Sequence, residues 1–176
     1  MNKENIVNIM RTASEEVFAT MLGLQTAAGP SYEEENMPTE SEGVVALIGL
    51  AGPYVGTGII TCSPAFACKI SSIMLMSEFE SVNGEVLDAM AEIANMIFGN
   101  VKTALEEELG PLGLSIPTVI FGRNFSTKSV GNQLWTVVPL ECEGENMQLK
   151  FFLTRNSNDS SLSARPGFSR PYAVHT

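Results

Sequence analysis

Apolar residues recur along this chain with two different spacings, one typical of helices and one typical of strands. In residues 4–22 and 85–109 they return every three or four positions, which predicts two long amphipathic helices. A glycine follows each of these stretches and is suited to ending a helix. Between them, Ser63-Pro64 provides an N-cap and a first-turn proline, so we expect a third helix that runs to about Met76.

Shorter apolar runs predict five strands, at residues 44–50, 54–61, 116–121, 134–140 and 147–154. Gly52-Pro53 lies between the first two runs and is a strong turn signal, so we expect a hairpin there. The acidic segment 31–42 is too polar to pack and predicts a solvated connector. This order of elements is typical of an α+β fold, with long helices packed on a largely antiparallel sheet.

The two long helices resemble each other in sequence. A shift of 76 positions aligns six residues of the first helix with six of the second: Ala13, Glu16, Val17, Met21, Leu22 and Gly23 with Ala89, Glu92, Ile93, Ile97, Phe98 and Gly99. Apolar spacing matches easily between any two amphipathic helices, whereas a shared Glu and a shared Gly are harder to attribute to chance. The match therefore indicates either a duplicated unit or a coincidence between two helices of the same type.

Composition narrows the class of protein. The 176 residues are 44% apolar and suit one globular domain, which we assign to residues 1–155, followed by a Ser/Asn/Pro-rich tail at 156–176. With 20 Asp and Glu against 10 Lys and Arg, the formal net charge is −10. So acidic a surface repels phosphate backbones and anionic lipids, and we therefore expect neither nucleic-acid nor membrane binding.

Cysteine and histidine offer little material for chemistry. The three cysteines form no C-x-x-C pair, and the one histidine, His175, lies at the end of the chain. We therefore expect reduced thiols, as in a cytoplasmic protein, and no metal site in this chain. No apolar run is long enough for a transmembrane helix, and the N-terminal residues do not have the pattern of a signal peptide.

A polar stripe runs along the second long helix, opposite its apolar face. At 100° per residue, the members of this stripe fall within about 80° of one another: Asp88, Glu92, Asn95, Gly99 and Lys102. Solvation is the commonest explanation for such a stripe. Asn and Gly, however, cost roughly 0.5 and 1 kcal/mol relative to Ala inside a helix. Gly99 would let a partner approach closely, and the Asn95 carboxamide can both donate and accept hydrogen bonds.

The stripe also carries a family resemblance. The run Asp88-Ala-Met-Ala-Glu92-Ile-Ala-Asn95, with Pro117 downstream, resembles the D/S-x-x-x-E-x-x-N…P signature of the CheC/CheX/FliY phosphatases of bacterial chemotaxis. The flanking segments 92–100 and 114–122, and the segment 16–23 of the first helix, are similar to that family too. The likeness covers about residues 4–155. The interval between Asn95 and Pro117 is one residue shorter than in the family pattern.

The resemblance implies a fold and an activity. It implies a CheC/CheX-like pseudo-repeat and hydrolysis of the aspartyl phosphate on a CheY-type response regulator, which supplies the phosphoryl group, Mg²⁺ and a lysine. Glu92 and Asn95 would be the catalytic residues: Asn95 would orient the attacking water, since a carboxamide is no base, and Glu92 would pair with the lysine. The docking surface around them would consist of Asp88, Met96, Gly99 and Lys102.

The first helix separates the branches of the family. It has Thr12, Glu16 and Ala19 where the second helix has Asp88, Glu92 and Asn95, so its copy lacks the carboxamide. One site per chain is the CheX-like arrangement, and CheX-type relatives form homodimers through joined sheets, which this sequence is compatible with.

Three other interpretations stay open. The fold could bind a receiver domain or a flagellar-switch component without catalysis. It could be a ligand-sensing or scaffold domain whose polar stripe is merely solvated. Asp88 and Glu92 could also form a paired-carboxylate metal or acid–base site, although no histidine or third acid is expected across from them.

Overall fold

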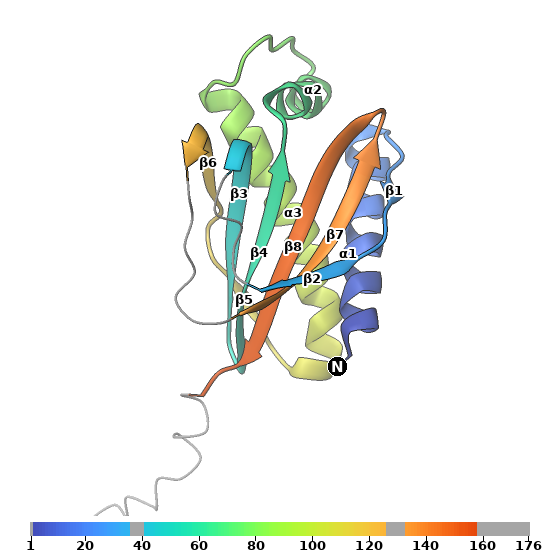
Figure 1. The fold of residues 1–176 in the computed structure, drawn as a ribbon, viewed down its shortest axis with the longest axis vertical. Coiled ribbons are helices and arrows are strands. Elements are labelled where there is room, and N and C mark those ends of the chain that lie inside the picture. The colour runs from blue at the N-terminus through green and yellow to red at the C-terminus, as the bar shows by residue number, and fades with distance from the viewer. Residues whose placement is uncertain (1, 36–40, 126–132, 158–176) are drawn as a thin grey trace, which may run out of the picture.

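The computed structural model describes residues 2–35, 41–125 and 133–157 (Figure 1). Its helices are α1 (Lys3–Val17), which continues into one π-helical segment, η1 (Phe18–Leu22), then α2 (Pro64–Leu75) and α3 (Gly84–Leu109). Its strands are β1 (Ala27–Ala28), β2 (Tyr32–Glu35), β3 (Ser41–Ala51), β4 (Tyr54–Cys62), β5 (Gly113–Leu114), β6 (Thr118–Phe125), β7 (Leu134–Cys142) and β8 (Glu145–Arg155). All three predicted helices and all five predicted strands are present.

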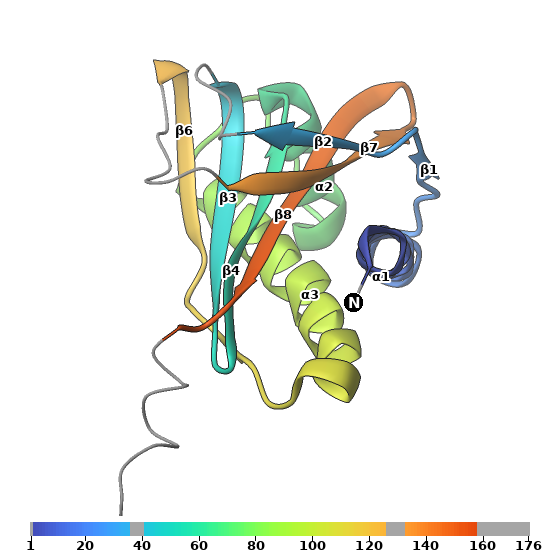
Figure 2. The ribbon, with the colours of Figure 1, turned by 60° about the horizontal axis from the view of Figure 1, so that its bottom comes forward.

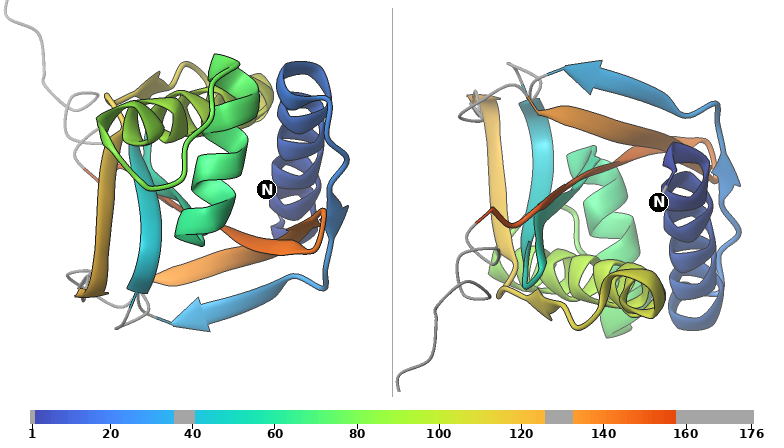
Figure 3. Two further views of the ribbon diagram at one scale, coloured as in Figure 1. Left: turned by 90° about the horizontal axis from the view of Figure 1, so that it is seen from above. Right: turned by 90° about the horizontal axis from the view of Figure 1, so that it is seen from below.

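The strands form a single antiparallel sheet, with β8 and β4 at its centre. β7 and β3 flank this central pair, and β2 and β6 lie outside them. The sheet curves around the helices, which lie on its concave side (Figures 2 and 3). The predicted α+β architecture is therefore confirmed.

The sheet also shows an internal repeat. The series α1, β2, β3 and β4 is followed, after α2, by the matching series α3, β6, β7 and β8. Each half places its outer strand against the other half: β2 pairs with β7, and β6 pairs with β3. Matching backbone bonds join the halves, from Gly29 N to Pro139 O and from Ser115 N to Gly49 O, both 2.9 Å long. The similarity between the two long helices thus reflects a duplicated unit.

The prediction that residues 31–42 form a solvated acidic connector is wrong in part. Residues Tyr32–Glu35 form β2, and β3 already begins at Ser41; residues 36–40 lie outside the described part of the chain. The Glu34 carboxylate accepts from the ammonium group of Lys150 at 2.9 Å, and that lysine side chain is buried. A glutamate in this strand therefore neutralises a buried charge 116 positions away, which local polarity could not reveal.

Close packing holds α3 on the sheet. Phe98, on the buried side of α3, stacks on Phe151 of β8 with the ring centroids 6.1 Å apart. The same ring lies over Gly58 of β4, where a Cβ atom would come within 2.6 Å of three ring carbons. Only glycine leaves room for this contact, so the backbone of β4 determines how closely α3 approaches. At its start, α3 is capped by Asn83, whose Oδ1 accepts from the Val86 amide at 3.0 Å.

The three cysteines are free and buried, as expected for reduced thiols: Cys62, Cys68 and Cys142. Burial raises the pKa of each thiol, that of Cys62 to about 12, so they stay protonated near neutral pH.

No helix in the described residues is long and apolar enough to cross a membrane. The predicted tail lies outside the described residues from position 158 on, while Asn156 is bound to the β3–β4 turn through Pro53 O and Gly52 O.

Candidate functional site

The polar stripe of α3 faces away from the core. Asp88, Glu92 and Asn95 are exposed, while the residues between them that face the sheet, such as Ile93 and Ala94, are fully buried. The 3.6-residue period of an α-helix produces this division, because positions 88, 92 and 95 are separated by four and three residues. The N-terminal half of α3 therefore presents two carboxylates and one carboxamide side by side.

A groove of about 320 Å³ runs alongside these three side chains. One wall comes from α3 and the other from the end of the α3–β6 connection (residues 110–117); the lining residues are Asp88, Ala91, Glu92, Asn95, Leu114, Ser115, Ile116 and Pro117. We call this the α3 groove. The chain leaves the end of α3, turns back and passes the stripe before β6 begins. The structure thus brings Pro117 next to the Glu and Asn of the signature, although 21 residues separate it from Asn95 in the sequence.

The three polar side chains that α3 contributes to the groove have no partners in the described part of the chain. No hydrogen bond or ion pair there engages Asp88, Glu92 or Asn95. Ordinarily a helix surface gains a little stability from pairs three or four residues apart. These three residues form none, so their hydrogen-bonding capacity is available to a partner.

The remaining predicted docking residues lie outside the lining of the α3 groove. Met96 is half-buried and packs against the core, and Gly99 is partly exposed one turn beyond Asn95. A Cβ atom on Gly99 would meet nothing within 4 Å, so packing inside this chain does not require a glycine there. Lys102 is engaged with Glu106, at 2.9 Å between its Nζ and Oε2. The docking roles of Met96, Gly99 and Lys102 stay predictions.

Glu106 is a structural link near the site that the sequence interpretation missed. Its Oε1 accepts from the Leu112 amide at 2.7 Å, while its Oε2 binds Lys102. The Leu112 amide, and after it Lys102, lowers the pKa of the Glu106 carboxyl below its ordinary value. Lys102 and Glu106 have the spacing of a helical ion pair, which was the available signal. Their contact with Leu112 ties the start of the α3–β6 connection to the helix.

The first repeat does not present a comparable site. Glu16 is exposed, but its Oε2 accepts a long, 3.4 Å hydrogen bond from Asn100 of α3. Ala19, at the position of the carboxamide, lies in the π-helical segment η1. A π-helical turn holds more residues than an α-helical one, so side chains beyond Glu16 are rotated relative to the α3 copy. The first copy therefore differs from the second in backbone geometry as well as in residue type.

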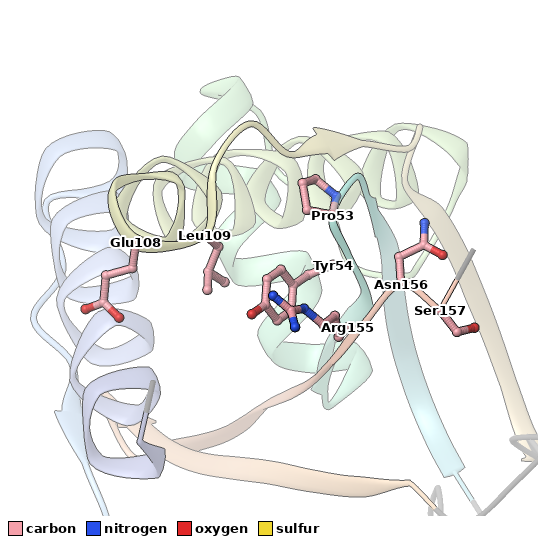
Figure 4. A pocket seen from close by; sticks show the side chains of 7 residues that line it. All are labelled: Pro53, Tyr54, Glu108, Leu109, Arg155, Asn156 and Ser157. Carbon is pink, nitrogen blue, oxygen red and sulfur yellow. The ribbon is translucent and has the colours of Figure 1, made fainter. Parts of the chain in front are cut away.

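A larger cavity, of about 670 Å³, lies at the other end of α3 (Figure 4). It is lined by Pro53, Tyr54, Glu108, Leu109, Arg155, Asn156 and Ser157. Glu108 is 13 residues beyond Asn95, about 20 Å along the helix at 1.5 Å per residue, and the two cavities share no residue. Its size alone would favour the larger cavity as the functional site, but its polar side chains do not form a recognisable catalytic arrangement. The signature residues lie in the α3 groove, which we take as the functional site.

Metal ligands do not gather in the described residues. No group of three or more His, Cys, Asp or Glu side chains there is arranged to hold an ion. Asp88 and Glu92 are one turn apart on an exposed helix face, and two carboxylates alone make a poor cage.

Comparison with known proteins identifies the family. A family model described as chemotaxis phosphatase CheX matches residues 44–141, more than half of the chain. The chain belongs to the CheX family of chemotaxis phosphatases. This confirms the CheX-like resemblance inferred from the signature. The match includes α3 and the α3–β6 connection, and hence both walls of the α3 groove.

Individual CheX relatives agree with this assignment. The chain is 28% identical over 127 residues to the CheY-P phosphatase CheX of Thermotoga maritima, which covers 72% of this chain and 81% of that protein. The crystal structure of CheX from Desulfovibrio desulfuricans has a TM-score of 0.75 at 25% identity, over 85% of this chain and 99% of that one. A CheX-CheY-BeF₃-Mg²⁺ complex from Borrelia burgdorferi shares the fold, with a TM-score of 0.73 at 21% identity, over 85% of this chain and 97% of that one.

Proposed function

We propose that this protein hydrolyses the aspartyl phosphate of a CheY-type response regulator, using the α3 groove. The observation that carries the proposal is the pairing of Glu92 and Asn95, both exposed and both without a partner in the described residues, at the positions of the family signature. The Thermotoga maritima relative is a CheY-P phosphatase, and the Borrelia burgdorferi complex contains CheX, CheY, BeF₃ and Mg²⁺.

The proposed hydrolysis requires few catalytic groups from this chain. Water attacks the phosphorus atom, the bond between phosphorus and the regulator's aspartate oxygen breaks, and inorganic phosphate and a free carboxylate are released. An acyl phosphate is already reactive, so positioning the water in line is the main contribution. We assign this task to Asn95, whose carboxamide accepts one hydrogen bond from the water and donates another to a phosphoryl oxygen. A carboxylate in its place would repel the phosphoryl group.

Glu92 lies one turn before Asn95 and has a separate role. We propose that its carboxylate pairs with the lysine of the regulator's active site and thereby sets the position of α3 on the partner. Mg²⁺ would be held by the regulator, where it neutralises charge on the phosphoryl oxygens. Asp88 extends the acidic surface by a further turn and would support docking to the same cationic pocket.

The direct test is the decay of a phosphorylated response regulator, followed with the wild-type protein and four variants. Asn95→Ala should slow catalysed decay by about 100-fold, as loss of one hydrogen-bonding group at a transition state does. Glu92→Ala should act mainly by raising KM. Asn100→Ala and Glu107→Ala remove the same side-chain types from α3 outside the groove and should leave the rate unchanged. Equal decay with all proteins would refute the proposal, and binding with an unchanged phosphoryl lifetime would favour a non-catalytic module.

We also propose that the protein is a homodimer. In the described part of the chain β6 is an outer strand, paired with β3 alone, and Phe121 on it is 46% exposed. An outer strand with free backbone groups is a place where two sheets can join. A sedimentation-velocity run at micromolar concentration should show a dimer, and a monomer would refute this.

The proposed substrate and the unpaired buried thiols both suit the cytoplasm.

A further inference from the structure

The wall of the α3 groove opposite the helix contains an exposed isoleucine. Ile116 lines the groove together with Glu92 and Asn95, and its side chain is 89% exposed. The sequence pattern predicted a strand over 116–121, which would have half-buried this residue. Instead β6 begins at Thr118, because Pro117 has no amide hydrogen with which to join the sheet. Ile116 therefore contributes almost nothing to the core of this chain.

The segment that carries Ile116 is tied down next to the groove. The Ser115 amide donates to Gly49 O at 2.9 Å, and the Ser115 Oγ accepts from the Gly49 amide at 2.8 Å. The same hydroxyl donates to the carbonyl oxygen of Ile116 at 3.0 Å. These bonds join the segment to β3 directly before the exposed side chain. The proline that follows restricts the backbone of Ile116 to extended conformations.

The other end of the connection is anchored to α3. Glu106 holds the Leu112 amide, and Leu112 itself is buried. The connection is thus fastened at both ends, to the helix that carries the stripe and to the strand beside it. An apolar side chain on so constrained a segment loses little conformational freedom when it is buried by a partner.

Resting on the proposed function, we propose that Ile116 is a docking residue for the response regulator. It packs on apolar side chains of the regulator next to the phosphorylated aspartate, while Glu92 and Asn95 enter the charged centre of that site. Ser115 is a positioning residue that holds Ile116 in the groove wall. An apolar contact at the rim adds affinity without bringing further negative charge near the phosphoryl group. The carboxylates of the acidic stripe cannot add affinity in this way, because each of them carries a negative charge.

Single exposed apolar residues are common on protein surfaces, so the test needs a matched one elsewhere. Met76 serves this purpose: it is 93% exposed, it lies at the end of α2, and it does not line the α3 groove. Ile116→Ala, Ile116→Leu and Met76→Ala should all fold normally, because none of them removes a buried side chain. Circular dichroism melts confirm this before the functional assays.

The experiment measures two quantities for each protein, with the CheY-type regulator of the same organism. One is the Kd for the beryllofluoride-activated regulator, and the other is the pair kcat and KM for its phosphorylated form. Ile116→Ala should raise Kd and KM about tenfold with kcat nearly unchanged, since burying one such side chain is worth about that factor. Ile116→Leu should largely restore both values, and Met76→Ala should leave them at the wild-type level.

Ser115 is tested by the same split between KM and kcat. Ser115→Ala removes the hydroxyl that binds Gly49 and should raise KM with little change in kcat. Ser115→Thr keeps a hydroxyl and should restore KM to about the wild-type value. A merely structural role would lower the melting temperature without moving KM.

Failure of this inference is distinguishable from failure of the proposed function. If Ile116→Ala binds and turns over the regulator as the wild type does while Asn95→Ala is inactive, the docking role is refuted and the phosphatase activity stands. If the wild type binds the regulator without dephosphorylating it, the proposed reaction is refuted and the Kd of Ile116→Ala still decides the docking role. If the wild type does neither, both are refuted.

Discussion

Replacing Gly99 by alanine should stabilise this protein and weaken its action on the regulator at the same time. Gly99 lies inside the 26-residue helix α3, where glycine is about 1 kcal/mol less favourable than alanine. A Cβ atom there would meet nothing within 4 Å in this chain. The full gain in helix propensity should therefore be realised, with no packing cost against it.

The size of both effects follows from the structure. A gain of about 1 kcal/mol should raise the melting temperature by about 2–4 °C for a domain of this size. If α3 docks along its stripe, the added methyl group lies where a partner's backbone comes close, one turn beyond Asn95. A clash of that kind typically costs about 1–3 kcal/mol, so KM should rise roughly 5- to 150-fold.

Gly84→Ala is the matched control for this variant. Like Gly99, it lies in α3 outside the lining of the α3 groove and has open space around its Cβ position, but it is in the first turn of the helix, 11 residues before Asn95. Thermal melts and the phosphatase assay on both variants separate the two effects. A lower melting temperature for Gly99→Ala would refute the packing argument, and an unchanged KM would refute a docking role for Gly99.

Three further predictions concern stability. Gly58→Ala should cost about 1–3 kcal/mol and slow catalysis, because the new methyl group displaces Phe98 and with it α3; an unaltered urea midpoint would contradict this. Glu34→Ala should cost about 1–3 kcal/mol in urea unfolding by leaving buried Lys150 unpaired, whereas Lys150→Met should cost less; equal losses would count against the charge argument. Because the pKa of Glu106 is lowered on folding, its ionised carboxylate stabilises the folded protein fully at pH values above the ordinary pKa of 4.5, and this contribution is lost as the pH falls through the lowered pKa. Glu106→Gln should remove that part of the acid dependence of stability, which thermal melts between pH 3 and pH 7 measure.

Local interactions made the helices predictable. Their apolar period of 3.6 residues and the Asn83 cap act within one or two turns, so the sequence places them to within a few residues. The same holds for the hairpin at Gly52-Pro53 and for the alignment of Asp88, Glu92 and Asn95 on one helix face. The catalytic pair proposed here could thus be found without a structure, because the geometry that presents it is that of a single helix.

Contacts between distant segments were not predictable in this way. β2 forms from an acidic run because β7 offers backbone partners and because the Glu34 carboxylate neutralises Lys150. Lys102 is a stripe residue by its position on the helix, yet its ammonium group is bound by Glu106, which holds the backbone of the α3–β6 connection. Neither outcome can be derived from the residues nearby, since each depends on a group that folding brings in from elsewhere.

The sequence by itself determined the three helices, five of the strands and which face of α3 is polar, and it indicated a similarity between the two long helices. Tertiary structure decided that the halves exchange their outer strands, that Pro117 lies beside Asn95, and that Ile116 is exposed at the rim of the α3 groove. The physical reason is range. Helix periodicity and capping are interactions between residues at most four positions apart, whereas a groove has two walls, and here the second wall is placed by hydrogen bonds from Ser115 to a strand 66 residues away.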